Sequence, residues 1–163
     1  MEQQIKMKFK DFICFEASIP KLKDADRNKS IRLLIDSLAK ANKLGKATPE
    51  KIAKAVIKRE NEASTGMGKG IALPHVKHES IPALAAAVGQ SRKGIDFSAL
   101  DKQPVHSVIL LLSPADNPDM HLQAMEYIFK HLQKEKFRKF LRQATTKKQI
   151  GELFKEADED PTL

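Results

Sequence analysis

A glycine-rich loop, a short apolar run and a histidine follow one another in residues 64–75, STGMGKGIALPH. The loop itself contains Ser64, Thr65, Gly66, Gly68 and Gly70. Because glycine adopts positive φ without steric cost, such a loop can turn tightly and bring backbone N–H groups close to an anion. Pro74 fixes its own φ and favours an extended residue before it, so His75 leaves the end of an expected strand in a defined direction. The segment therefore predicts a phosphoryl group held beside an imidazole.

An ATP-binding P-loop is the main competing interpretation of this loop. That motif needs Gly-Lys followed by Ser or Thr, and it lies between a strand and a helix. Here Gly70 follows Lys69, so no hydroxyl is placed to bind magnesium, and the next residues favour a strand. The spacing of a dinucleotide-binding fingerprint is also absent, which argues against both kinds of nucleotide site.

Further motifs follow the loop in a fixed order. They are Gly94-Ile95-Asp96-Phe97, Gln103-Pro104-Val105-His106, the apolar run 108–112 and His121-Leu122. Together with residues 59–75, these motifs resemble a type-2 enzyme IIA domain of the phosphoenolpyruvate-dependent sugar phosphotransferase system, the fructose/mannitol and nitrogen-regulatory class. The resemblance covers residues 15–155, between an N-terminal arm or strand at 1–14 and an acidic C-terminal tail at 156–163.

The resemblance implies a phosphocarrier that works through a phosphohistidine. Its histidine accepts a phosphoryl group from HPr or an HPr-like protein and passes it to an enzyme IIB partner, or serves as a regulatory signal read by a target protein. His75 matches the acceptor, His121 the second active-site histidine, and Arg59 the active-site arginine. The family resemblance also implies that the ring nitrogen remote from the backbone is phosphorylated. Sugar uptake and nitrogen regulation both remain open at this point.

Two helices are expected before the loop. Apolar residues recur at helical spacing in 28–44, which predicts a helix that stops at Gly45. Thr48 and Pro49 are typical of an N-cap and a first helical residue, and they open a second helix that carries Arg59 near its end. Arginine offers a planar, permanently charged fork that suits phosphate oxygens.

Short strands interleave with further helices in the rest of the chain. Strands are expected at 71–73, 84–90 and 105–112, and shorter amphipathic helices at 135–143 and 147–155. The strand at 105–112 is nearly all apolar, which is typical of a central strand covered on both faces. The predicted fold is α/β, a single-domain sandwich with a central mixed β-sheet flanked by helices.

A helix is also expected from the cap signals at 116–119 through about residue 133. Its predicted core stripe consists of Leu122, Met125, Phe129 and Leu132. His121 lies in its first turn, where free N–H groups and partial positive charge favour an anion. His131 falls on the opposite side of the helix and is expected to be solvated.

The histidines could instead be the ligands of a metal site. His78 and His106 could join His75 and His121 around zinc, but no carboxylate or cysteine falls at a familiar ligand spacing. Phosphoryl transfer needs a neutral imidazole instead, which an ordinary histidine pKa of about 6.5 provides at pH 7. No metal or cofactor is therefore expected.

Chain length and composition limit the number of domains, the location and the disulfides that can be expected. A chain of 163 residues that is 41% hydrophobic suits one domain, and without a long apolar run or signal-peptide core we expect it to be cytoplasmic. Its one cysteine, Cys14, is expected to be buried and cannot form an internal disulfide.

The net charge of +8 leaves a second functional hypothesis open. Eight basic residues lie between Lys130 and Lys148 against the single acidic Glu135. This pattern allows a basic module that binds nucleic acid or protein and keeps the fold without phosphotransfer. Apolar residues in the same region and the lack of an aromatic stacking platform favour a solvated helix face instead, so nucleic acid is not the expected partner.

Overall fold

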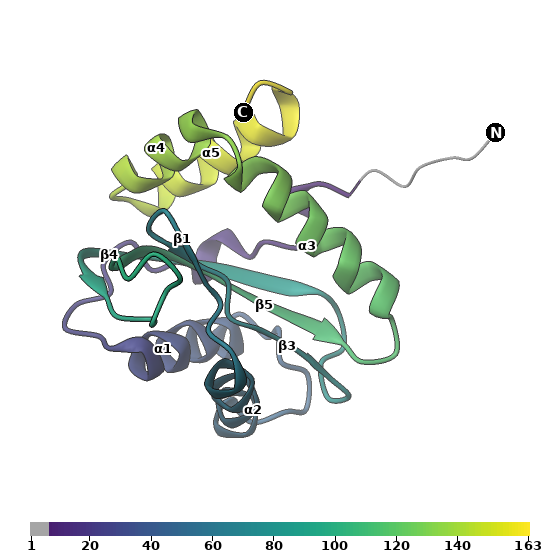
Figure 1. Cartoon of the computed structure of the whole chain (residues 1–163). Coiled ribbons are helices and arrows are strands. Elements are labelled where there is room, and N and C mark those ends of the chain that lie inside the picture. The colour runs from purple at the N-terminus through teal and green to yellow at the C-terminus, as the bar shows by residue number, and fades with distance from the viewer. Residues whose placement is uncertain (1–6) are drawn as a thin grey trace.

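The computed structural model describes residues 7–163 and shows one mixed sheet between two layers of helices (Figure 1). The helices are η1 (Phe9–Asp11), η2 (Phe15–Ala17), α1 (Arg27–Lys40), α2 (Pro49–Glu62), α3 (Pro118–Leu132), α4 (Glu135–Gln143) and α5 (Lys147–Glu159). The strands are β1 (Gly66–Gly68), β2 (Ile71–Ala72), β3 (His75–His78), β4 (Ala85–Ile95) and β5 (Val105–Pro114). Helices α1 and α2 cover one face of the sheet, and α3, α4 and α5 lie on the other side. The predicted α/β sandwich with a mixed sheet is confirmed.

Strand β5 lies in the middle of the sheet. On one edge it pairs antiparallel with β4, and on the other it pairs parallel with β2 and then with β3. Ile71 lies opposite Ser107, while His75 lies opposite Leu111, so β2 and β3 follow one another along the same edge. Pro74 comes directly before β3, and β1 folds back antiparallel on β2.

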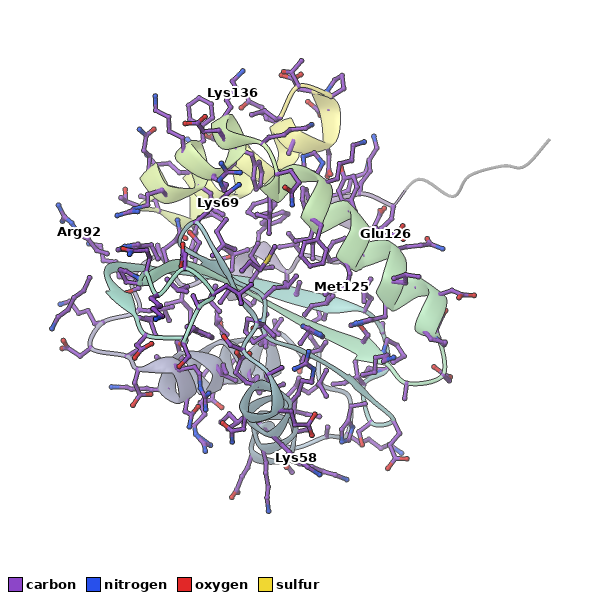
Figure 2. The ribbon with its side chains drawn as sticks, in the orientation of Figure 1. Lys58, Lys69, Arg92, Met125, Glu126 and Lys136 are labelled. Carbon is purple, nitrogen blue, oxygen red and sulfur yellow. The ribbon has the colours of Figure 1, made fainter. Side chains whose placement is uncertain are left out.

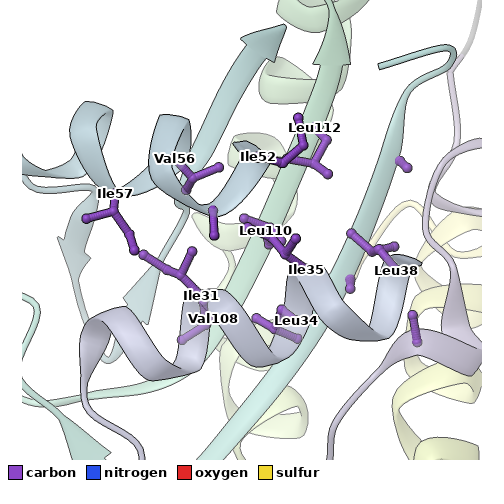
Figure 3. Close-up of a cluster of buried hydrophobic side chains, with 14 of the residues drawn as sticks. Ile31, Leu34, Ile35, Leu38, Ile52, Val56, Ile57, Val108, Leu110 and Leu112 are labelled. Carbon is purple, nitrogen blue, oxygen red and sulfur yellow. The ribbon is translucent and has the colours of Figure 1, made fainter. Parts of the chain in front are cut away.

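The side chains of β5 alternate between two hydrophobic cores. Val108, Leu110 and Leu112 pack with α1 and α2, as Figure 3 shows. Ile109 and Leu111 face the core that α3, α4 and α5 share with the N-terminal segment. A strand covered on both faces reads as a continuous apolar run, which explains the pattern at 105–112.

The capping signals before the loop behave largely as expected. The side chain of Thr48 accepts a hydrogen bond from the Lys51 N–H, and Pro49 is the first residue of α2. The predicted end of α1 is wrong, because the helix stops at Lys40 rather than at Gly45. Asn42, at φ +61°, takes the left-handed conformation that often ends a helix, two residues after the last turn.

The predicted core stripe of α3 is wrong at two positions. Leu122 is 57% exposed and Phe129 is 36% exposed, whereas Ala124 and Ile128 are fully buried. His131, expected in solvent, is 2% exposed. The buried face of α3 contacts residues that are remote in sequence, so the spacing of apolar residues along the helix did not predict which face is buried.

The aromatic cluster around His131 explains this difference. Its ring centroid lies 4.9 Å from that of Phe9 and 4.7 Å from that of Tyr127. Phe9 comes from the N-terminal segment, which forms η1 rather than a strand at this point. The earlier part of the expected N-terminal arm, residues 1–6, lies outside the described residues.

Both ends of the described chain are packed against the domain. The Cys14 N–H donates to the Ala86 carbonyl oxygen of β4, and Cys14 is buried as expected. The helix expected at 147–155 continues as α5 to Glu159, and Leu163 in the acidic C-terminal segment is buried. The Asp158 carboxylate accepts the N–H of Phe9, which ties the two ends together. No helix within residues 7–163 has the length and apolar character needed to cross a bilayer.

The corrected orientation of α3 can be tested with two truncations on the same helix. Ile128→Ala removes a fully buried side chain and should lower the free energy of unfolding by about 2–5 kcal/mol. Leu122→Ala removes an exposed side chain and should change it by less than about 0.5 kcal/mol. Urea unfolding of both variants measures the difference, and a larger loss for Leu122→Ala would contradict this orientation.

Candidate functional site

His75 begins β3, and its backbone position is set by pairing with Leu111 of β5. The ring Nδ1 lies 2.7 Å from the carbonyl oxygen of Leu73. Since a carbonyl only accepts hydrogen bonds, Nδ1 carries the proton in the neutral ring and Nε2 keeps a free electron pair. Burial lowers the pKa of His75 below its ordinary value, and the charge of Arg59 lowers it further against the opposing effect of the Leu73 carbonyl. The structure thus favours a neutral imidazole whose free electron pair is on Nε2.

His121 lies next to it, on the first turn of α3, which Asn117 caps by accepting the Met120 N–H. The ring centroids of His75 and His121 are 5.5 Å apart, with the rings inclined at 42°. Burial, together with the neighbouring His75 and Lys77, lowers the pKa of His121 to about 4. Both rings are therefore neutral near pH 7.

Ser113 sets the orientation of His121. Its Oγ lies 2.5 Å from Nδ1 of His121, and the residue is completely buried near the end of β5. Within residues 7–163, Nδ1 is the single hydrogen-bond partner of this hydroxyl. A buried hydroxyl needs an acceptor for its proton, so Ser113 donates to Nδ1 and the His121 proton resides on Nε2. The sequence motifs did not single out Ser113, because the contact depends on how α3 folds back over β5.

Arg59 and Glu60 occupy the last turn of α2, before the loop. Arg59 is half-buried, and its Nη1 donates to the carbonyl oxygen of Ala63 at 3.0 Å. Its effect on the pKa of His75 shows that the guanidinium charge acts at the imidazole. The arrangement places a permanent positive charge near His75.

Glu60 is a second residue that the sequence motifs missed. Its carboxylate is 2% exposed and accepts the N–H and the hydroxyl of Thr65, each at 2.6 Å. The Thr65 carbonyl in turn accepts the N–H of Leu73, whose own carbonyl orients His75. A charge-assisted chain of hydrogen bonds thus connects the end of α2 to the imidazole.

The glycine-rich loop forms a hairpin instead of an open cradle. Gly68 and Gly70 adopt φ of +87° and +80° at its tip, where the Lys69 N–H donates to the Asp101 carboxylate. The Ser64 hydroxyl donates to the Phe97 carbonyl oxygen at 2.5 Å and accepts the N–H of Gly66. These glycines serve the tight turn.

The expected ring of loop amides around a phosphoryl group is therefore not formed. The N–H groups of Thr65 and Gly66 are bonded within the protein. Gly70 accepts from Ser107, whereas His75 pairs with Leu111, about 13 Å further along β5 at 3.3 Å per residue. The structure places His121 next to His75 and the Arg59 charge within electrostatic reach of His75, but it does not bring Gly68 and Gly70 to them.

The other histidines make separate contacts. His78 Nδ1 accepts the N–H of Ser80, and His106 Nδ1 lies 2.9 Å from the carbonyl oxygen of Ser91. Within the described part of the chain, no three His, Cys, Asp or Glu side chains are grouped as metal ligands.

Comparison with known proteins decides the family. The family model described as phosphoenolpyruvate-dependent sugar phosphotransferase system, EIIA 2, matches residues 16–157. The chain belongs to this family. As an EIIA domain, it is a phosphocarrier component of the phosphotransferase system.

Both fructose-specific components and nitrogen regulatory proteins are similar to this EIIA domain. The fructose-specific EIIABC component of Bacillus subtilis is 32% identical over 137 residues, which cover 84% of this chain and 21% of that protein. The chain thus spans about a fifth of that relative's length. The nitrogen regulatory protein of Klebsiella oxytoca is 35% identical over 132 residues, which cover 80% of this chain and 81% of that protein.

Solved structures share the fold. The nitrogen regulatory protein IIA-Ntr from Neisseria meningitidis aligns with a TM-score of 0.80 at 18% identity, covering 88% of this chain and 97% of that one. The enzyme IIA chain in a complex with phosphorylated enzyme IIB for mannitol, from Escherichia coli, aligns at 0.73 and 21% identity, covering 86% and 95%. The EIIA domain therefore shares its fold with both the nitrogen regulatory protein and the mannitol enzyme IIA.

The lowered pKa of His121 predicts a specific loss of stability in acid. Because this pKa is about 4 in the folded protein and near 6.5 in the unfolded chain, the unfolded chain binds more protons between these values. The free energy of unfolding should fall as the pH drops from about 6.5 towards 4. In His121→Gln this fall should be shallower, measured by urea unfolding across the pH range, and parallel curves would contradict the assignment.

Proposed function

We propose that Nε2 of His75 accepts a phosphoryl group from HPr or an HPr-like protein and passes it to an enzyme IIB partner or a regulated target. The observation that carries this proposal is the 2.7 Å contact between His75 Nδ1 and the Leu73 carbonyl oxygen. It leaves the electron pair of Nε2 free to form the new N–P bond while the bond between phosphorus and the donor breaks. The proton stays on Nδ1, so accepting the phosphoryl group needs no base.

His121 and Arg59 would stabilise charge on the transferring group. Nε2–H of His121 is a hydrogen-bond donor, because Ser113 occupies Nδ1. Arg59 adds permanent positive charge without competing for the phosphoryl group as a nucleophile. In phosphoryl transfer, positioning and electrostatic stabilisation supply most of the catalysis. A negative phosphoryl group would also raise the pKa of His121 and strengthen this contact.

Partner docking is proposed on the exposed apolar stripe of α3. Leu122, Met125 and Phe129 recur at a spacing of three and four residues, directly after His121. Met125 is partly buried against the core, and Figure 2 shows it between α3 and the sheet, while Leu122 and Phe129 reach the surface. Exposed apolar groups beside a reactive atom are typical of a protein interface. The solved complex of a IIA protein with phosphorylated IIB supports an enzyme IIB partner.

The acceptor role can be tested by intact mass after incubation with phosphoenolpyruvate, enzyme I and HPr. Wild type should gain one phosphoryl group that is labile in acid and stable in alkali, and His75→Ala should gain none. His78→Ala, on the same strand, is the matched control and should be phosphorylated like wild type. Phosphorylation of His75→Ala would refute the assignment of the acceptor.

The positioning role of Ser113 predicts a defect that does not depend on stability. Ser113→Ala removes the donor to His121 Nδ1 and should slow phosphoryl transfer about tenfold, because the tautomer is no longer fixed. Ser113→Thr keeps the hydroxyl and should restore most of the rate. Nitrogen NMR of His121 reports the tautomer directly, and an unchanged Nε2–H form in Ser113→Ala would contradict this role.

A further inference from the structure

A pocket of about 750 Å³ lies away from the two active-site histidines. Three segments that are remote in sequence form it: the loop before α1, the distal part of β4 with the start of β5, and the connection between α4 and α5. This volume is in the range of pockets that bind small molecules. The EIIA reaction proposed above uses none of its lining residues.

The charges around this pocket are strongly biased. Its cationic residues are Lys21, Lys23, Arg92, Lys93 and Arg142, and Asp24 is the one carboxylate. Like charges gathered at one concave site repel each other and create a positive potential that attracts anions. A ligand with several negative charges would relieve this repulsion.

The wall of the pocket is more apolar than its charges suggest. Leu22 and Ala144 contribute buried apolar side chains. Gln90, 5% exposed, donates from Nε2 to the carbonyl oxygens of Leu141 and Ala144, while its buried Oε1 has no partner among the described residues. A buried acceptor beside a pocket suits a ligand that carries a hydrogen-bond donor, directly or through a water. The occupant should therefore combine phosphates with an organic body.

The pocket and the phosphoryl site are on opposite edges of β5. Gln90 of β4 pairs with Ser107, whereas His75 of β3 pairs with Leu111 on the other edge. Figure 2 shows Arg92 at the end of the sheet that is remote from α2 and Lys58. An anion in this pocket is thus separate from the phosphoryl group on His75.

We infer that this basic pocket binds a small phosphorylated molecule, such as a nucleoside polyphosphate. The phosphates contact the cations at the rim, and the organic body enters the apolar interior beside Gln90. The pocket is a binding site without a catalytic role, and it gives the phosphocarrier a place where a soluble metabolite could act.

Calorimetry with ATP, adenosine and inorganic triphosphate tests this inference on the whole chain. ATP should bind more tightly than either part alone. Lys93→Gln/Arg142→Gln should weaken ATP binding by about tenfold or more, because two charge-assisted contacts are lost. Lys54→Gln/Lys58→Gln removes the same charge from α2, far from the pocket, and should leave binding nearly unchanged. His75→Ala should bind ATP like wild type, which separates this result from the proposed phosphotransfer.

Several outcomes would overturn the inference. They are equal weakening in both double variants, triphosphate binding as tightly as ATP, or ATP-induced amide shifts at Val76 and Lys77 instead of Gln90 and Thr145. Tighter binding of single-stranded oligonucleotides with increasing length would assign the charges to a nucleic-acid surface instead of a metabolite pocket.

Discussion

The site depends on the register of β5. This strand is buried on both faces and hydrogen-bonded on both edges, so a slip by one residue would turn its core side chains to the wrong layer. The same register places His75 opposite Leu111 and puts Ser113 under His121. The hydrophobic cores therefore fix the distance between the two imidazoles, although neither core contains them.

The electrostatics of the site follow from that placement. Burial disfavours the charged form of both histidines, and the positive groups nearby act in the same direction. Two neutral imidazoles with the Arg59 charge near His75 form a site that favours an added anion. In the proposed function, a phosphoryl group on His75 would offset the cost of positive charge on His121, so the electrostatics of the free protein would already suit the phosphorylated form.

The sequence predicted those parts of the structure that local rules determine. Thr48 and Pro49 mark the start of α2 because capping is a contact within one turn, and the apolar run of β5 reflects burial on both faces. The orientation of α3 could not be read in this way. Its buried face depends on Phe9, which arrives from the other end of the chain, so His131 is buried and Leu122 is not.

The residues of the candidate site fall into the same two groups: some lie on local motifs, and others depend on tertiary contacts. The sequence could propose His75, His121 and Arg59 because their motifs are local, and the structure places His121 next to His75 and the Arg59 charge near His75. Ser113 and Glu60 act through contacts that only the tertiary fold creates, and nothing in their local sequence distinguishes them from ordinary strand and helix residues. The loop glycines favoured an anion-binding loop, but the structure uses Gly68 and Gly70 in a tight hairpin. Their local sequence could not distinguish the two, because the same positive φ suits both a tight turn and a loop around an anion.

The half-burial of His75 reconciles two demands of the proposed function. A carrier must expose its phosphoryl group to a donor and then to an acceptor, so the site cannot be closed by its own chain. It must also hold that group in one orientation, which the Glu60, Thr65 and Leu73 hydrogen bonds achieve from beneath the ring. If a partner docks on the apolar stripe beside His121 as proposed, it would exclude water from the site, because Leu122 and Phe129 are exposed in the free domain. In the proposed function, the domain itself would supply the orientation, and each bound partner would supply the shielding from water.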